Sequence, residues 1–398
     1  MSKPAITTQM VHAGERRTLP VGLPVVNPIY TTATYTYASM AEVDKVFAGE
    51  SPDYIYTRNG DPTVAALEEA MTIIEDGAAA FAYSSGMAAL HAALFACELS
   101  PGASVLASAD LYGASFELLY KIFGSLGVKT VTANFSDLDA LREKVAEIKP
   151  RVLLAETISN PLLKVCDIAA CAEIAHKVGA RLIVDNTFAT PFLCQPLKFG
   201  ADFTVHSATK YLGGHADTMG GVVVAREEFD SAALVGVKKL VGGVLSVWEA
   251  HQILRGIKTL ALRIERQCAN AKFLAEHLSN HPKIEAVFYP GLNSSAEREV
   301  VQRVLREPFG GALVSIKLKE NTREAAFRFM DALNLCVRAT SLGDVFTGVS
   351  HPAISSHREL SPSKRQSLGI SDGLVRISVG IEDAADIIAD IEQALEQN

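Results

Sequence analysis

The stretch Val205-His206-Ser207-Ala208-Thr209-Lys210-Tyr211-Leu212-Gly213-Gly214 places one lysine beside two hydroxyl residues and ahead of a glycine-rich tail. The strand-like run RLIVD, upstream of it, ends at Asp185. A lysine that forms a Schiff base must lose its proton and be held still. A pyridinium cofactor also needs a carboxylate at its ring nitrogen. Lys210 and Asp185 together therefore predict pyridoxal phosphate (PLP), with Ser207 and Thr209 as hydroxyl ligands of the phosphate.

Each half of this pair also has an ordinary interpretation. A lysine after Ser-x-Thr is usually a solvated surface lysine, and the sequence alone leaves that alternative open for Lys210. Asp185 is more informative, because ligands of open α/β sheets bind outside the carboxyl ends of the strands. The pair, rather than either residue, carries the cofactor prediction.

The surrounding sequence resembles a known family. VDNTFATPFLCQPL followed by GADFTVHSATKYLGGHAD is similar to the trans-sulfuration enzymes, the Cys/Met-metabolism family of PLP enzymes. The similarity runs from about Val11 to about Ala394, and several separate motifs match in the same order. The resemblance implies an α/β fold of the aspartate aminotransferase type (fold type I). That fold has a mostly parallel sheet in a large domain and a smaller α+β C-terminal domain.

Composition sets the outer limits of the interpretation. The chain has 398 residues, 48% hydrophobic and 21% charged, which is typical of a globular protein of two domains. The net charge of −8, without a basic block, argues against nucleic acid or an anionic membrane as the main partner. The start of the chain has no apolar h-region, so we expect a cytoplasmic protein. The six cysteines are scattered, which predicts free thiols and no metal site.

Residues 1–62 have weak periodicity and much proline, asparagine and glycine, which predicts an extended arm rather than a packed unit. By resemblance, this arm wraps a neighbouring subunit, and Tyr56 and Arg58 reach the cofactor phosphate of that subunit. Arginine suits this role because its planar fork binds phosphate bidentately. Where the family usually has asparagine before the proline, this chain has Asp61.

Residues 63–255 alternate between strand-like and helix-like segments, which predicts a mostly parallel sheet covered by helices on both faces. A short apolar strand leads into Gly86 and Met87 and then into a long apolar helix, whose N-terminus suits a phosphate. By resemblance, Tyr112 stacks on the cofactor ring and is a potential acid or base. A long helix is expected near Trp248 to Leu262, as the link to the next domain.

Residues 256–398 form the predicted C-terminal domain, with ALVSIKL and LVRISVGI as its clearest strands. Arg376 lies inside the second of these, so it either sits at an exposed edge or pairs with an anion. By resemblance, Arg376 binds the substrate α-carboxylate, Ser341 lies beside that carboxylate, and Asn160 contacts both the cofactor and the substrate. Residues outside these motifs differ from parts of the family: Ala114, Glu117 and Thr340 stand where some members carry cysteine, arginine and glutamate.

The resemblance implies an enzyme whose catalytic residues are Lys210 and Tyr112. The leading hypothesis is γ-elimination on methionine or a related thioether, giving a 2-oxo acid, ammonia and a thiol. γ-Replacement on an O-acyl homoserine is close behind, as in cystathionine γ-synthase or a homoserine-ester sulfhydrylase. A PLP aminotransferase and a non-catalytic member of the family are alternatives of other classes. A homotetramer built from active dimers, with each site shared across a dimer, is also implied.

Overall fold

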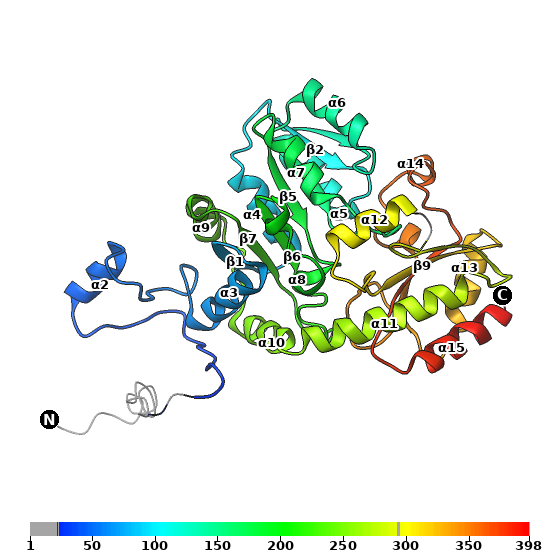
Figure 1. Ribbon diagram of the computed structural model, residues 1–398. Coiled ribbons are helices and arrows are strands. Elements are labelled where there is room, and N and C mark those ends of the chain that lie inside the picture. The colour runs from blue at the N-terminus through cyan, green and yellow to red at the C-terminus, as the bar shows by residue number, and fades with distance from the viewer. Residues whose placement is uncertain (1–21, 23, 293–294, 398) are drawn as a thin grey trace.

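The computed structural model describes residues 22, 24–292 and 295–397. Two sheets organise the chain, one of seven strands and one of five (Figure 1). The first part of the predicted arm, residues 1–21 and 23, lies outside the described residues. The next part, residues 24–61 with the helix α2 (Met40–Phe47), extends away from the rest of the chain (Figure 1).

The seven-stranded sheet has five parallel strands in a row and two further strands at one side. Its order is β1 (Ala79–Tyr83), β7 (Gly221–Ala225), β6 (Phe203–Ser207), β5 (Arg181–Asp185), β4 (Val152–Glu156), β2 (Ser104–Ser108) and β3 (Lys129–Ala133). β7 pairs antiparallel with both β1 and β6, and the pairs from β6 to β3 are all parallel. Glu156 pairs with Asp185 in the β4–β5 register, so these strands end at the same edge.

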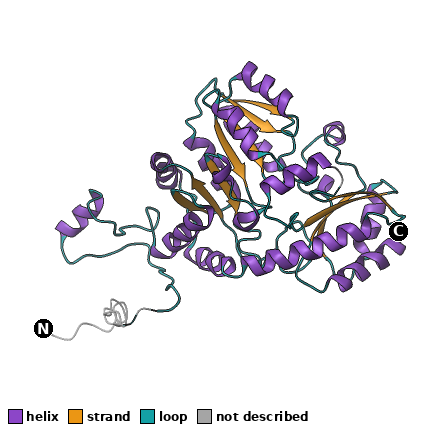
Figure 2. Cartoon of the chain, in the orientation of Figure 1, coloured by secondary structure: helices purple, strands orange, loops and turns teal. Residues whose placement is uncertain are grey.

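Helices cover both faces of this sheet, which confirms the predicted α/β class (Figure 2). The helical segments of this part of the chain are α3 (Pro62–Glu75), α4 (Gly86–Ala96), α5 (Gly113–Glu117), η1 (Leu118–Phe123), α6 (Leu138–Ile148), α7 (Ile168–His176), α8 (Thr190–Leu193), η2 (Pro196–Phe199), η3 (Glu228–Asp230), α9 (Ser231–Val241) and α10 (Val247–Ile257). Because both faces are buried, strands such as β4 are apolar nearly throughout instead of alternating.

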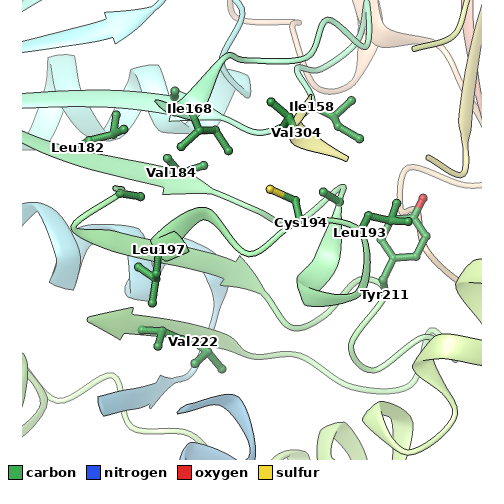
Figure 3. Close-up of a cluster of buried hydrophobic side chains, with 14 of the residues drawn as sticks. Ile158, Ile168, Leu182, Val184, Leu193, Cys194, Leu197, Tyr211, Val222 and Val304 are labelled. Carbon is green, nitrogen blue, oxygen red and sulfur yellow. The ribbon is translucent and has the colours of Figure 1, made fainter. Parts of the chain in front are cut away.

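Alternate residues of each strand face two separate hydrophobic cores. Ile183 and Val205 point toward α4, α5 and α9. Leu182 and Val184 point the other way, toward α3 and α7, in the core drawn in Figure 3. That second core also includes Val304, the last residue of the helix α12 (Ser295–Val304).

The five-stranded sheet is mostly antiparallel and has the order β10 (Val337–Arg338), β11 (Gly348–Ser350), β12 (Leu374–Ser378), β9 (Leu313–Leu318) and β8 (Ile284–Phe288). Only its β10–β11 pair is parallel. The helical segments around it are α11 (Leu260–Leu278), α12 (Ser295–Val304), α13 (Arg323–Asp331), η4 (Pro352–Ile354), α14 (Pro362–Ser367) and α15 (Ala384–Glu396). This is the predicted second α+β unit, whereas the proposed boundaries at residues 62 and 255 stay predictions.

The link between the two sheets is two helices rather than one continuous helix. α10 ends at Ile257 and α11, of 19 residues, begins at Leu260. The Gly256 carbonyl accepts from the guanidinium of Arg263 at 2.8 Å and from the Thr259 amide at 3.1 Å, so a tight turn replaces the next α-helical bond.

The helix α3 begins at Pro62, and the Asp61 side chain caps it by accepting from the Thr63 amide at 2.8 Å. All six cysteines are free, with the sulfurs of Cys166 and Cys171 3.6 Å apart. Within the described ranges, no helix is both long and apolar enough to cross a membrane.

Candidate active site

A cavity of about 260 Å³ lies at the carboxyl edge of the seven-stranded sheet, where the five-stranded part of the chain meets it. Nine of the residues predicted from the sequence line it: Gly86, Met87, Tyr112, Asn160, Asp185, Ser207, Thr209, Lys210 and Arg376. Residues that the sequence analysis did not assign to a site also line it: Ser85, Leu90, Ser115, Glu156, Ile158, Thr187, Phe188, Met219, Thr340, Leu342 and Ser356.

The N-terminus of α4 forms one end of the cavity. Ser85 caps this helix, and its hydroxyl accepts from the Ala88 amide at 3.1 Å. The first amides of a helix have no acceptor within the helix, so those of Gly86 and Met87 are suited to an anion. A Cβ on Gly86 would lie 2.7 Å from the Cβ of Ser207, so glycine allows this helix end to approach the Ser207 hydroxyl closely.

Lys210 follows β6 and extends toward residues of the second sheet. Its Nζ donates to Ser341 Oγ at 3.0 Å, which brings Ser341 to the site although Ser341 does not line the cavity. Burial lowers the pKa of Lys210, and the nearby charge of Arg376 lowers it further. A lowered pKa favours the neutral amine, which is the nucleophilic form of a lysine.

Asp185 ends β5 and is held by a residue that the sequence analysis missed. Its Oδ1 accepts from the Thr187 amide at 2.9 Å and from the Thr187 hydroxyl at 2.5 Å. Thr187 Oγ1 in turn accepts from the Ser207 amide at 2.8 Å, which ties β5 to the loop that carries Lys210. Burial raises the pKa of Asp185, while the two bonds from Thr187 oppose that rise. A hydroxyl two residues after a strand-ending aspartate is a signal that could have identified Thr187.

Arg376 lies in β12, between β11 and β9, so the edge alternative for it is wrong. Only 4% of its surface is exposed, because the seven-stranded domain covers that face of the strand. Its Nη1 donates to Asn160 Oδ1 at 2.8 Å, and its guanidinium lies 5.9 Å from the centre of the Phe188 ring. Burial lowers the pKa of Arg376 to about 10. The Nε of Arg376 is buried without a hydrogen-bond partner among the described residues, so the guanidinium retains capacity for an anion.

Tyr112 stands at the mouth of the cavity with 41% of its surface exposed. It precedes α5, and its backbone amide donates to the carboxylate of Glu156 at 2.6 Å. The Tyr112 ring therefore forms one wall of the cavity, and the hydrogen bond to Glu156 fixes its backbone.

Tyr56 and Arg58 do not line this cavity. The Arg58 guanidinium lies 5.7 Å from the centre of the Tyr56 ring and donates to the Lys239 carbonyl. Arg58 therefore contacts α9 of its own chain and not the cavity. The predicted role of Tyr56 and Arg58 in the site of a neighbouring subunit is not tested by a single chain, and it stays a prediction.

The donor set of the cavity fits PLP. Helix amides and two hydroxyls lie at one end, as a phosphate requires, and Asp185 is a partly buried carboxylate suited to a protonated ring nitrogen. Lys210 supplies an amine of lowered pKa, and Arg376 and Asn160 supply donors for a carboxylate. Among the described residues, no group of three or more histidine, cysteine or acidic side chains is arranged to hold a metal.

Fold and cavity together define a PLP-dependent enzyme that acts on amino acids. The model of the Cys/Met metabolism PLP-dependent enzymes matches residues 7–396, and the chain belongs to that family. A structure from Campylobacter jejuni, with a TM-score of 0.89 and 30% identity, carries N′-pyridoxyl-lysine-5′-monophosphate; the alignment covers 96% of this chain and 97% of that one. PLP is therefore the cofactor of this chain.

Relatives within the family differ in activity. An L-methionine gamma-lyase from Fusobacterium nucleatum is 41% identical, over 100% of this chain and 99% of the relative. An O-succinylhomoserine sulfhydrylase from Pseudomonas aeruginosa is also 41% identical, over 98% of this chain and 95% of the relative. The structure of a cystathionine gamma synthase from Xanthomonas oryzae superimposes with a TM-score of 0.88 at 35% identity, over 100% of this chain and 99% of that one.

Proposed function

We propose that this chain catalyses γ-elimination on methionine or a closely related thioether amino acid. Water completes the reaction, and the products are 2-oxobutyrate, ammonia and a thiol. The observation that carries the proposal is that Lys210, Asp185 and the hydrogen-bonded Asn160–Arg376 pair line one cavity. The full-length similarity to methionine gamma-lyases supports the choice of substrate.

The two ends of the substrate are recognised by different parts of the chain. Arg376 and Asn160, with Ser341 beside them, bind the α-carboxylate by charge-assisted hydrogen bonds. The thioether arm extends along the wall formed by Tyr112, Thr340 and Ser356. Bound PLP supplies an electron sink that stabilises negative charge at the substrate α-carbon.

Proton transfer is the work of Lys210 and Tyr112. With the substrate held at the cofactor, Lys210 Nζ would take the proton from the substrate Cα, give that proton up to the cofactor, and only then take a second proton from Cβ. Asp185 keeps the ring nitrogen protonated, so that the ring can accept charge. The Tyr112 phenol gives a proton to the departing sulfur, so the leaving group is a thiol rather than a thiolate.

γ-Replacement on an O-acyl homoserine is the second candidate, and the similarity to an O-succinylhomoserine sulfhydrylase favours it. The same residues serve both reactions up to the loss of the γ-substituent. The two reactions differ in whether water or an added thiol then reacts. An aminotransferase is disfavoured by the family, whose relatives are lyases and sulfhydrylases.

The test is product analysis on the purified holoenzyme. Methionine alone should release 2-oxobutyrate and methanethiol. Turnover only when an O-acyl homoserine and a thiol are supplied together would overturn γ-elimination in favour of replacement. Amino transfer to an added 2-oxo acid without cleavage of the C–S bond would overturn both.

We further propose a cytoplasmic homotetramer whose active sites are shared within dimers. Arg58 would then serve the neighbouring cavity, since it does not reach its own. A mixture of Arg58→Ala and Lys210→Ala chains, refolded together, should recover part of the activity that each variant lacks. No recovery would show that each arm serves its own chain, and light scattering would give the mass of the assembly.

A further inference from the structure

Glu156 is a buried carboxylate that the steps above do not use. It is the last residue of β4 and stands beside Asp185, the last residue of β5, in the parallel register. It lines the same cavity with 9% of its surface exposed.

The two oxygens of Glu156 hold two different turns of the site. Oε1 accepts from the backbone amide of Tyr112 at 2.6 Å. Oε2 accepts from the backbone amide of Asn160 at 3.1 Å. The Tyr112 turn follows β2 and the Asn160 turn follows β4, so one side chain joins two loops that the sheet alone leaves separate.

The position of Glu156 is electrostatically unfavourable for a charged carboxylate. Burial raises its pKa well above the ordinary value, and the charge of Asp185 raises it further. Asp110 adds to the rise, and the hydrogen bonds from the Tyr112 and Asn160 amides lower the pKa. A carboxylate buried beside another acid needs such bonds, and its two acceptors match the two donors that converge on it.

The contacts of Glu156 extend to the second sheet. Arg376 donates to the side chain of Asn160, and the backbone of Asn160 donates to Glu156. Glu156 also accepts from the backbone amide of Tyr112. A continuous set of hydrogen bonds therefore runs from the carboxylate-binding arginine to the aromatic wall.

We infer that Glu156 is a positioning residue, whose carboxylate fixes the Tyr112 turn and the Asn160 turn relative to each other. The catalytic meaning of that spacing rests on the proposed function, in which Tyr112 protonates the leaving group and Asn160 orients the α-carboxylate. We call the two hydrogen bonds from the Tyr112 and Asn160 amides to Glu156 the brace. The brace can be tested whether or not the proposed function is correct.

Hydrogen exchange of the apoprotein, followed by mass spectrometry, measures the brace directly. Glu156→Gln keeps one acceptor oxygen but puts an NH₂ group opposite the other amide, so one of the two bonds is lost. We expect exchange about tenfold faster or more in segments 110–116 or 158–163, and no change in α11. Glu156→Ala should accelerate both segments.

Glu117→Gln is the matched control. Glu117 belongs to the same short helix as the Tyr112 turn but pairs with Lys121, four residues on. This variant should leave exchange in both segments unchanged. If Glu156→Gln does not fold, Glu156→Asp carries the same test, because its shorter side chain cannot reach both amides.

Enzyme activity provides a second, independent test. If the holoenzyme turns over methionine, Glu156→Gln should lower kcat/KM about 10-fold to 100-fold and Glu117→Gln should leave it unchanged. Unchanged exchange in both segments, for every folded Glu156 variant, would overturn the brace. Accelerated exchange in a protein that cleaves no thioether would keep the brace and overturn the proposed substrate instead.

Discussion

The two sheets present their site residues in different ways. The seven-stranded sheet offers residues where its parallel strands end: Glu156 on β4, Asp185 on β5 and Ser207 on β6. The five-stranded sheet offers Arg376 from the middle of a central strand. The first arrangement collects short acidic and hydroxyl groups at one edge. The second needs a long side chain that crosses from one domain to the other.

This difference assigns different work to the two sheets. We propose that the groups at the carboxyl edge surround the cofactor and transfer protons. Arg376 meets Asn160 across the junction, and we propose that this pair holds the substrate. Changes at the first sheet should therefore lower kcat, whereas changes at the second should raise KM.

Lys210→Ala should have the largest effect, because the variant loses both the amine that binds the cofactor and the proton-transfer group. We expect kcat to fall by about 10³-fold or more. Steady-state release of 2-oxobutyrate measures this, with the exposed Lys129→Ala as control. Near-normal turnover would show that Lys210, and with it the edge of the first sheet, does not take part in the chemical step.

Asp185→Asn should come next. The amide keeps the shape of the side chain and an acceptor for Thr187, but it cannot neutralise a protonated ring nitrogen. We expect kcat to fall about 10²-fold with little change in KM. A rise in KM of similar size would contradict the division of work between the sheets.

Arg376→Lys tests the second sheet. Lysine keeps a positive charge but loses the planar fork that binds a carboxylate and Asn160 together. We expect KM for methionine to rise about 10-fold to 100-fold, as the loss of one charge-assisted hydrogen bond implies, with a smaller change in kcat. An effect confined to kcat would show that Arg376 contributes to the chemical step, as the residues of the first sheet do, and would contradict the proposed division of roles.

The smallest expected effect is on the pKa of Lys210, which follows the first sheet, when Arg376 in the second sheet is replaced. The Arg376 charge lowers the pKa of Lys210, so removing that charge should raise this pKa. In the Arg376→Gln apoprotein, the pH midpoint for the reaction of Lys210 with added PLP should move to higher pH, because more of the amine is protonated at a given pH. Absorbance during reconstitution gives the midpoint. An unchanged or lower midpoint would show that Lys210 does not respond to the second sheet.

The parallel edge could be predicted well from the sequence. Strands buried on both faces are apolar throughout, so a charged or hydroxyl residue at the end of such a strand, as at Asp185, is conspicuous. Lys210 then followed from its neighbours and from the resemblance. Glu156 ends a similar strand, but the sequence did not show that its oxygens meet two backbone amides.

The second sheet was harder to predict. An arginine inside a strand pattern favours an exposed edge, and only tertiary packing shows that Arg376 is buried against Asn160, 216 residues earlier in the chain. Ser356 has no local signal either, because its loop reaches the cavity by packing on Gly113, where a Cβ would lie 2.2 Å from the Ser356 carbonyl oxygen. Such contacts depend on how two separately folded layers meet.

The part of the cavity lining that comes from the second sheet's side, Thr340, Leu342 and Ser356, also has an evolutionary consequence. These residues come from connections of the second sheet, far in sequence from the strand ends that surround Lys210. A lineage can therefore alter the wall, and with it the accepted side chain, while inheriting the strand ends unchanged. An L-methionine gamma-lyase and an O-succinylhomoserine sulfhydrylase that are both 41% identical to this chain are the outcome that such separate inheritance allows.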